Sequence, residues 1–310
     1  MILCVGEILA DMIGKEKDGV MSFERYAGGA PFNVCVGINN LGCKAGFIGS
    51  VGDDLTGHFL VDYVNKLNLE YTNINVDKNH NTTLAFVANG KDGERSFCFN
   101  RKNTADYQIP SENLSKIEDA QIVVLGSLML SEELGIKTAD EVVSLAKKNN
   151  VLLSFDVNYR DDIYNSAKEA IDISLKYVKQ ANIVKFSEDE IKLLSGLDDI
   201  DLGVKKLTND SQLVLVTLGK NGSRFYFHGM RQDVKSIKVN PVDTTGAGDA
   251  FYASVLASLD GRNIEFLTND ELVGILKQAN ICGAMACMKK GALSSLPTKK
   301  ELEEYLKKLS

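Results

Sequence analysis

The chain of 310 residues has 44% hydrophobic and 25% charged residues, an ordinary composition for a globular protein that is long enough to bury a sizeable core. A net charge of -7 excludes a global basic field for nucleic acid, and no apolar run reaches the length of a membrane span. The six cysteines form no C-x-x-C pair and the three histidines no zinc-binding pattern. We therefore expect reduced thiols, a cytoplasmic location and small-molecule partners.

Short β-rich apolar runs alternate with helical patterns along the chain. The expected strands span 2–8, 45–51, 121–127, 151–157, 182–186 and 213–218, and expected helices between them span 31–41, 57–67, 139–148 and 167–179. The first apolar run has no positive region before it and soon reaches Glu7, so it predicts a buried strand rather than a signal peptide. This alternation predicts an α/β fold in which a mainly parallel sheet is flanked by helices on both faces.

Two regions break the alternation. Residues 83–87 and 95–99 have strand patterns joined across the glycine-containing turn 90–93, which predicts a β-hairpin. Residues 12–27 also look extended, with a turn near 17–19. From pattern alone, these segments form either a small sheet that projects from the main domain or an ordinary edge hairpin. No long linker divides residues 1–310, so we expect one domain.

The segment 242–251 (V-D-T-T-G-A-G-D-A-F) places a small turn directly before a helical pattern. Backbone N–H groups at a helix start are unpaired and can bind an anion, and Gly246, Ala247 and Gly248 would supply them. Asp249 lies in the same turn and would act as the general base. An anion cradle beside a carboxylate suits phosphoryl transfer to an alcohol, whereas a bare G-A-G-D would indicate only capping and turn residues.

The full run D-T-T-G-A-G-D-A-F resembles the C-terminal signature of the ribokinase/fructokinase family of carbohydrate kinases. The family's N-terminal signature has its counterpart in A-G-G-A-P-F-N-V (27–34), followed by Gly42, by G-S-V-G-D-D (49–54) and by Gly57. The two signatures occur in the expected order, and the resemblance covers essentially the whole chain. It implies a ribokinase-like fold with a small β-sheet lid, formed by about 12–27 and 82–102, and ATP-dependent phosphorylation of a small sugar.

The resemblance also implies which residues hold the sugar. Asp11, the backbone of Gly28 and Gly29, and Asn33 would contact it. In the hairpin pattern R-S-F-C-F-N-R (95–101), an aromatic ring at Phe99 would cover one sugar face and Arg101 would bind the acceptor. Fructokinases usually carry an aromatic residue where this chain has Asn100. The segment F-D-V-N-Y-R (155–160) resembles the D-x-N-x-R of fructokinases and 2-keto-3-deoxygluconate kinases, and it makes Asn158 and Arg160 candidates for binding substrate or phosphate.

The nucleotide side is implied by further matches. The segment K-F-S-E-D-E (185–190) occupies the place of the family's N-x-x-E motif, which helps to organise Mg²⁺ and phosphates, with Ser187 in place of asparagine. The implied nucleotide-binding residues are Lys185, Ser187, Glu190, Thr217, Gly219, Gly222 and Asn280. Asp243 and Thr245 match positions that bind K⁺ or another monovalent cation, and backbone carbonyls near Ala286 and Gly291, with Ser295, would complete the oxygen shell. The chain contains neither a Walker A pattern nor G-x-G-x-x-G, so its phosphate grip is of another kind.

Fructokinase is the preferred activity, on the segments 27–33, 95–101 and 155–160. The alternatives are 2-keto-3-deoxygluconate kinase and ribokinase. A non-catalytic regulator that binds sugar or nucleotide is a different class, which the intact Asp249 disfavours, and a dinucleotide oxidoreductase is disfavoured by the absent fingerprint. Exposed lid sheets in this family often pair between subunits, so a homodimer through the lid is plausible.

Overall fold

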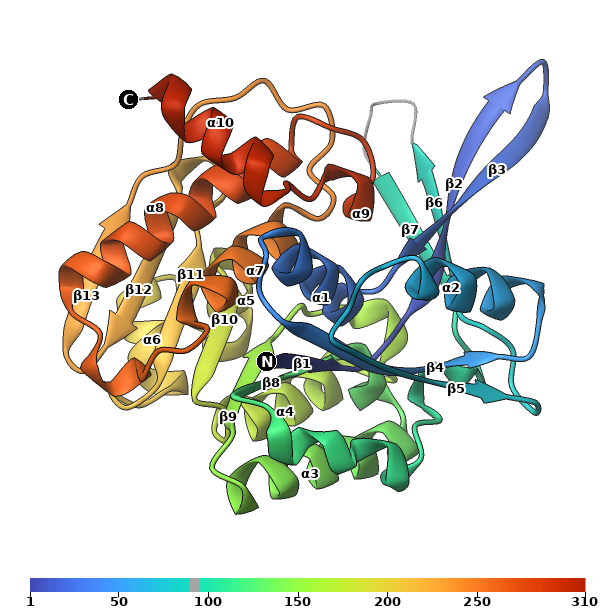
Figure 1. The fold of residues 1–310 in the computed structure, drawn as a ribbon, viewed down its shortest axis with the longest axis horizontal. Helices are drawn as coiled ribbons and strands as arrows, with labels where there is room; N and C mark the ends of the chain where they lie inside the picture. Colours follow the sequence, from blue (N-terminus) through green and yellow to red (C-terminus); the bar gives the residue numbers. More distant parts are fainter. Residues whose placement is uncertain (90–94, 310) are drawn as a thin grey trace.

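The structure, a computed structural model, describes residues 1–89 and 95–309, and nine strands in these ranges form the large sheet. Their order is β13-β12-β11-β10-β9-β8-β1-β4-β5 (Figure 1). Neighbouring strands from β11 to β5 along this order pair in parallel, and β11, β12 and β13 pair antiparallel at one edge. The strands are β1 (Ile2–Val5), β4 (Ala45–Gly52), β5 (Tyr71–Asp77), β8 (Ile122–Leu125), β9 (Leu152–Asp156), β10 (Ile183–Ser187), β11 (Leu213–Thr217), β12 (Ser223–Phe227) and β13 (Met230–Val234).

Helices cover both faces of this sheet and bury a hydrophobic core on each. The central strand β1 shows the division, because Ile2 and Cys4 belong to one core and Leu3 and Val5 to the other. The first core receives α1 (Ala30–Asn40), α2 (Leu55–Asn65), α7 (Ala247–Leu259) and α8 (Asn269–Ala286). The second receives α3 (Glu133–Lys148), α4 (Ala167–Val178), α5 (Glu188–Ser195) and α6 (Ile200–Leu207). The chain ends in α9 (Ala292–Ser295) and α10 (Lys299–Leu309).

A second, four-stranded sheet in the order β3-β2-β6-β7 projects from the body (Figure 1). It consists of β2 (Leu9–Lys17), β3 (Val20–Gly28), β6 (Leu84–Asn89) and β7 (Arg95–Asn100). The parallel pairing of β2 with β6 joins two hairpins into one sheet, so the segments form a projecting sheet and not an isolated edge hairpin. The predicted turn 90–93 lies outside the described residues. We call this second sheet the lid.

The predicted strands and helices are confirmed, with two helix starts that lie earlier than expected. Asp54 caps α2 by accepting the N–H groups of Thr56 and Gly57, so the helix begins at Leu55. Helix α3 begins six residues before the expected start, where Gly135 allows it to pass close to the carbonyl of Met129; a Cβ there would lie 2.0 Å from that oxygen.

Short 3₁₀ helices link the elements: η1 (Ala105–Tyr107), η2 (Ser111–Asp119), η3 (Leu128–Ser131), η4 (Asp161–Ile163), η5 (Gly219–Asn221) and η6 (Ile264–Phe266). None of the helices described is both long and apolar enough to cross a membrane.

Candidate active site

A cleft of about 610 Å³ lies between the lid and the carboxyl ends of the parallel strands, where open α/β sheets bind their ligands. The body contributes the loops after its strands and the first turns of α1 and α7, and the lid contributes one face of β2, β6 and β7. The lining residues are Leu9, Asp11, Gly29, Ala30, Asn33, Ala85, Phe99, Leu128, Asn158, Arg160, Lys185, Pro241, Val242, Asp243, Thr244, Thr245, Gly246, Gly248, Asp249 and Ala292.

Helix α7 begins at the floor of this cleft in a conformation that requires glycine. Gly246 is its N-cap with φ 79°, and a Cβ there would lie 2.9 Å from the Cα of Ala292. Gly248 faces open space, and a Cβ on it would approach only the side chain of Lys185, 3.5 Å from Nζ. Ala247 does not line the cleft, and its N–H donates to the carbonyl of Thr244. The helix start therefore offers a positive end to the cleft through Gly246 and Gly248, with Ala247 behind them.

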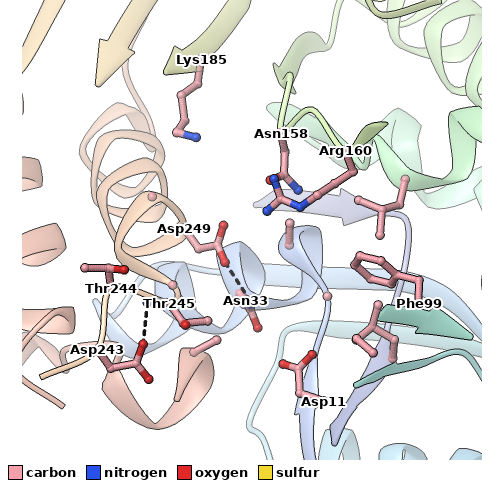
Figure 2. Close-up of a pocket in the computed structure, with 18 of the residues that line it drawn as sticks. Asp11, Asn33, Phe99, Asn158, Arg160, Lys185, Asp243, Thr244, Thr245 and Asp249 are labelled. Carbon is pink, nitrogen blue, oxygen red and sulfur yellow. Dashed lines mark hydrogen bonds between the residues drawn. The ribbon is translucent and has the colours of Figure 1, made fainter. Parts of the chain in front are cut away.

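Asp249 lies in the first turn of α7 and is held by the first turn of α1. The Nδ2 of Asn33 donates to its Oδ2 at 2.8 Å (Figure 2). The two helices can approach closely because Gly37 lies against Ala253, where a Cβ on the glycine would be only 2.6 Å away. Burial raises the pKa of Asp249, while the hydrogen bond from Asn33 and the charge of Lys185 oppose that rise. The carboxylate is thus a stronger base than an ordinary aspartate and remains aimed into the cleft.

The register of the lid brings three cleft residues onto one face. Asp11 pairs with Ala85 across β2 and β6, and Ala85 pairs with Phe99 across β6 and β7. Side chains that are directly opposite in a sheet share a face, so all three point into the cleft. Asp11 lies against Gly28, where a Cβ would be 2.3 Å from its Oδ2. Burial, and next the charge of Asp249, raise the pKa of Asp11 to about 7.

The opposite wall comes from the ends of β9 and β10. Asn158 has a positive φ of 38°, which asparagine tolerates, and both Asn158 and Arg160 line the cleft (Figure 2). Lys185 is buried and its Nζ contacts both oxygens of Asp156, at 2.9 and 2.8 Å. Burial lowers the pKa of Lys185, but the charges of Asp156, Glu190 and Asp249 and the hydrogen bond to Asp156 together outweigh this, so the net shift is upward. Lys185 therefore stays protonated beside the start of α7. The segment 155–160 contains Asp156, but its position beside Lys185 could not be predicted from the sequence, because it depends on the pairing of β9 with β10.

Arg101 was predicted to contact the sugar, and the structure places it elsewhere. Its alternation with Phe99 fails because β7 ends at Asn100. Arg101 is 6% exposed, does not line the cleft, and donates from Nε to Oδ2 of Asp106 at 2.8 Å. Its guanidinium is thus occupied at the base of the lid. Leu9 and Leu128 line the apolar wall instead, two residues that the sequence did not single out because apolar residues near strand ends are also typical of a core.

Apart from Lys185, the predicted nucleotide-binding residues do not line the cleft. Ser187 and Glu190 form a capping box at the start of α5, and Glu190 also accepts the N–H of Tyr159 at 2.8 Å. Asn280 donates to the carbonyl of Val234, and a Cβ on Gly222 would meet that same carbonyl at 2.1 Å. Thr217 and Gly219 lie at the connection from β11 to η5. Contacts of these residues with a nucleotide remain predictions.

The predicted cation residues gather around Asp243. Its Oδ1 accepts the N–H of Thr245 at 2.9 Å and its Oδ2 accepts the N–H of Gly291 at 2.8 Å. The hydroxyl of Ser295 donates to the carbonyl of Ala292. Ala286 is the last residue of α8, directly before this loop region. Within residues 1–89 and 95–309, no group of three or more His, Cys, Asp or Glu side chains is arranged to hold a metal ion. The loop instead offers a mixture of carbonyl, hydroxyl and carboxylate oxygens.

The chain is similar along almost its whole length to known proteins. Residues 1–299 match the family described as pfkB family carbohydrate kinase. A probable fructokinase-2 from Arabidopsis thaliana is 36% identical, over 99% of this chain and 96% of that protein. The fructokinase from Xylella fastidiosa, solved with bound ATP, superposes with a TM-score of 0.91 at 28% identity, covering 99% of this chain and 98% of the other.

A second solved relative carries both kinds of ligand. The fructokinase from Vibrio cholerae O395, in a form with fructose, ADP and calcium ion bound, has a TM-score of 0.90 at 30% identity and covers 98% of both chains. A double mutant of that protein was solved with fructose, ADP and potassium ion, at 29% identity and a TM-score of 0.90, covering 98% of this chain and 97% of the other.

Proposed function

The chain belongs to the pfkB family of carbohydrate kinases, and from that membership we propose that it transfers the γ-phosphate of ATP to a hydroxyl of fructose. One observation carries the proposal: the carboxylate of Asp249, held by Asn33, lies between the positive start of α7 and the lid face that carries Asp11 and Phe99. This arrangement separates a phosphate side from a sugar side, with a base between them.

We assign the chemical step to Asp249. The acceptor hydroxyl oxygen forms a bond to the γ-phosphorus, the bond from that phosphorus to the oxygen of ADP breaks, and the hydroxyl proton passes to the Asp249 carboxylate. Asn33 keeps the carboxylate aimed at the acceptor. Phe99 covers one face of the sugar and excludes water, which would otherwise compete as the acceptor.

Charge on the phosphates would be met by the start of α7 and by Lys185. Gly246 and Gly248 line the cleft at the N-terminal end of α7, and a preorganised N–H donor there would typically contribute roughly 3–4 kcal/mol at the transition state. The ammonium of Lys185 lies beside Gly248 and adds a fixed positive charge. Arg160, which follows β9, also lines the cleft and can neutralise the transferred group. The rest of the nucleotide would be bound by the other residues that the family resemblance implies: Ser187, Glu190, Thr217, Gly219, Gly222 and Asn280.

Two kinds of metal ion suit the oxygen donors near the phosphate side. Mg²⁺, bound together with ATP, would supply neutralisation of the phosphate charge, and Glu190 would reach it through water because its two oxygens already accept the N–H groups of Tyr159 and Ser187. The loop of Asp243 and Thr245, with Ala286, Gly291 and Ser295, offers the hard oxygen ligands that suit a monovalent cation such as K⁺.

The charges in the sugar half favour a neutral sugar over a sugar acid. A 2-keto-3-deoxy acid needs a cation for its carboxylate, and Arg101 is already engaged with Asp106. The Asp11 carboxyl in the same half would repel an acid when it is ionised. Arg160 lines the cleft and could bind an acid, which keeps 2-keto-3-deoxygluconate as the alternative acceptor.

A screen of acceptors with a coupled ADP assay tests the proposal. We expect fructose to give the highest kcat/KM among fructose, ribose and 2-keto-3-deoxygluconate. A tenfold preference for 2-keto-3-deoxygluconate, about 1.4 kcal/mol of transition-state stabilisation, would move the assignment to the acid without changing the kinase mechanism. Absence of ATP consumption with all acceptors would indicate a non-catalytic binding protein.

We further propose that the lid pairs with the lid of a second copy. Met21 and Phe23 lie on the face opposite Asp11 and Phe99 and are 49% and 43% exposed. Phe23 also packs edge-to-face against Phe86 of β6, with 5.2 Å between the ring centroids. Sedimentation velocity should show a dimer that Phe23→Asp dissociates, while Phe266→Asp, at a residue that is 79% exposed on the body, leaves it intact. A monomeric wild-type protein would contradict this proposal.

A further inference from the structure

A buried charged cluster lies at the base of the lid, outside the lining of the cleft. Its centre is the pair of Arg101, 6% exposed, and Asp106 of η1, 1% exposed. The Nε of Arg101 donates to Oδ2 of Asp106 at 2.8 Å, and Nη2 lies 2.8 Å from the same oxygen. Removing one partner from such a pair leaves an uncompensated buried charge, so each side chain constrains the position of the other.

The second oxygen of Asp106 ties together the two lid strands where they leave the body. Its Oδ1 accepts the hydroxyls of Thr83 and Thr104. Thr83 directly precedes β6, and Thr104 follows the end of β7 by four residues. Arg101, which holds the other oxygen, directly follows β7. One carboxylate therefore fixes both ends of the β6–β7 hairpin at its hinge.

Arg101 extends the same cluster to the wall of the cleft. Its Nη1 donates to the hydroxyl of Ser131, which in turn donates to the carbonyl of Leu128 at 3.0 Å. Leu128 packs with Leu9 and Ala85, and Phe99 packs against this group. All four side chains line the sugar half of the cleft. A displacement of Arg101 would thus reach the apolar wall that faces the sugar.

A third titratable group, Glu7, borders the cluster from the body. It follows the central strand β1, is 0% exposed, and neither of its carboxyl oxygens has a hydrogen-bond partner among the residues described. Burial raises the pKa of Glu7 to about 8, and the charge of Arg101 opposes the rise. Glu7 therefore adds a titratable group, just after the central strand, to the electrostatic surroundings of Arg101 and Asp106.

We propose that Arg101 and Asp106 are positioning residues of the sugar half: they fix the hinge of the lid so that Phe99 and Leu128 close on the acceptor. The inference rests on the proposed function, since it assigns the lid wall to sugar binding. In this proposal Arg101 positions the lid and does not contact the sugar directly. The positioning role and the contact role make different demands on Asp106. A direct contact requires Arg101 alone, whereas positioning requires both partners equally.

The test compares Arg101→Met, Asp106→Asn and the double variant with the wild-type enzyme. We expect each single variant to raise the KM for fructose at least tenfold and to leave the KM for ATP within about twofold. The double variant should be no worse than the more affected single variant, because both changes break one unit. Arg101→Lys, which retains the charge, should recover part of the loss. Arg224→Met is the control, because it removes an arginine that pairs with the more exposed Asp233 on the β12–β13 hairpin, away from the lid; it should leave both KM values unchanged.

A milder variant, Ser131→Ala, keeps both buried charges and removes the hydrogen bond between Arg101 and η3. It therefore tests the proposal even if the variants that change a buried charge fail to fold. It should raise the KM for fructose by about threefold or more and reduce the protection that fructose gives against thermal unfolding. A large effect of Arg101→Met together with an effect of Asp106→Asn below twofold would overturn the proposal and assign Arg101 to direct contact. Unchanged KM values for fructose in all variants would overturn it as well. Absence of fructose turnover by the wild-type enzyme would contradict the proposed function itself, and the inference would fall with it.

Discussion

Asp249 is the residue on which the proposed chemistry depends, and its surroundings explain how an aspartate can serve as the base. Burial raises its pKa, and the hydrogen bond from Asn33 limits that rise. A base is most effective when its pKa approaches the working pH while it still remains ionised. The pair thus combines a stronger base with a fixed direction.

Replacing this carboxylate is the first prediction. Asp249→Asn preserves the shape of the side chain but removes the proton acceptor. We expect kcat to fall by about 10²–10⁴-fold, the usual contribution of a general base. The KM for ATP should remain within about twofold, because the start of α7 and Lys185 are unchanged. Steady-state kinetics give both values, and a kcat within about threefold of wild type would remove Asp249 from this role.

At the phosphate side, the turn before α7, the start of α7 and the loop before α9 lie together. Helix α7 can begin there only because Gly246 adopts a positive φ against Ala292. Asp243 holds the preceding turn to the loop before α9 by accepting the N–H groups of Thr245 and Gly291. The anion cradle is therefore built from two segments that lie far apart in the chain, the turn that leads into α7 and the loop before α9.

Gly246→Ala tests whether this start must be glycine. The substitution forces a left-handed conformation that costs an L-residue about 1–2 kcal/mol, and its Cβ would also press on Ala292. We expect a loss of kcat together with lower stability. Gly261→Ala is the matched control: Gly261 has φ 74° but nothing lies within 4 Å of a Cβ there, so it should lose stability alone. Urea unfolding and kcat, measured for both variants, separate the two effects; full activity in Gly246→Ala would argue against the cradle.

The loop of Asp243 leads to a prediction about monovalent cations. We expect the rate in potassium buffer to exceed the rate in tetramethylammonium buffer, because a small cation would join the oxygens of this loop beside the cradle. Asp243→Asn should reduce the difference between the two buffers. Initial rates at constant ionic strength provide the measurement. Equal rates of the wild-type enzyme in the two buffers would leave these residues as capping and turn residues.

At the scale of the molecule, acidic side chains converge at the carboxyl ends of the strands. Burial raises the pKa of Glu7 to about 8 and that of Asp11 to about 7. A carboxyl group with a raised pKa holds in the folded state a proton that the unfolded chain has already released. Its contribution to stability is therefore complete at acid pH and declines as the pH rises through the interval between the two pKa values.

The raised pKa of Glu7 predicts how the free energy of unfolding depends on pH. For Glu7 the interval runs from its ordinary value of 4.5 to about 8, so the free energy of unfolding should fall between these limits. Glu7→Gln keeps the size of the side chain and removes its titration, so the variant should lose less stability than wild type between pH 5 and pH 8. Urea midpoints at the two pH values make the comparison. An identical decline in both proteins would mean that Glu7 does not carry the buried proton.

The secondary-structure elements and the position of the catalytic turn could be predicted from the amino-acid sequence. The local pattern predicts the buried strand at 2–8, found at 2–5, and the first helix at 31–41, found at 30–40, because each pattern reflects how the element is buried against the core. The two glycine-rich signatures likewise carry backbone requirements, such as the positive φ of Gly246, that no other residue type meets as easily. The parallel sheet and the turn before α7 followed from these local rules, whereas the pattern left open whether the extra strands form a projecting lid, which only the family resemblance implied.

Only the tertiary structure decided which partners the charged residues have. Arg101 lies two residues after Phe99, and the alternation of a strand would have put both on the sugar; the strand ends at Asn100, and Asp106 takes the guanidinium instead. The same holds for the contact of Lys185 with Asp156 and for the burial of Glu7 at the end of β1. A charge binds whichever opposite charge or donor the packing brings within a few ångströms, and that depends on segments far apart in the chain, which no local pattern encodes.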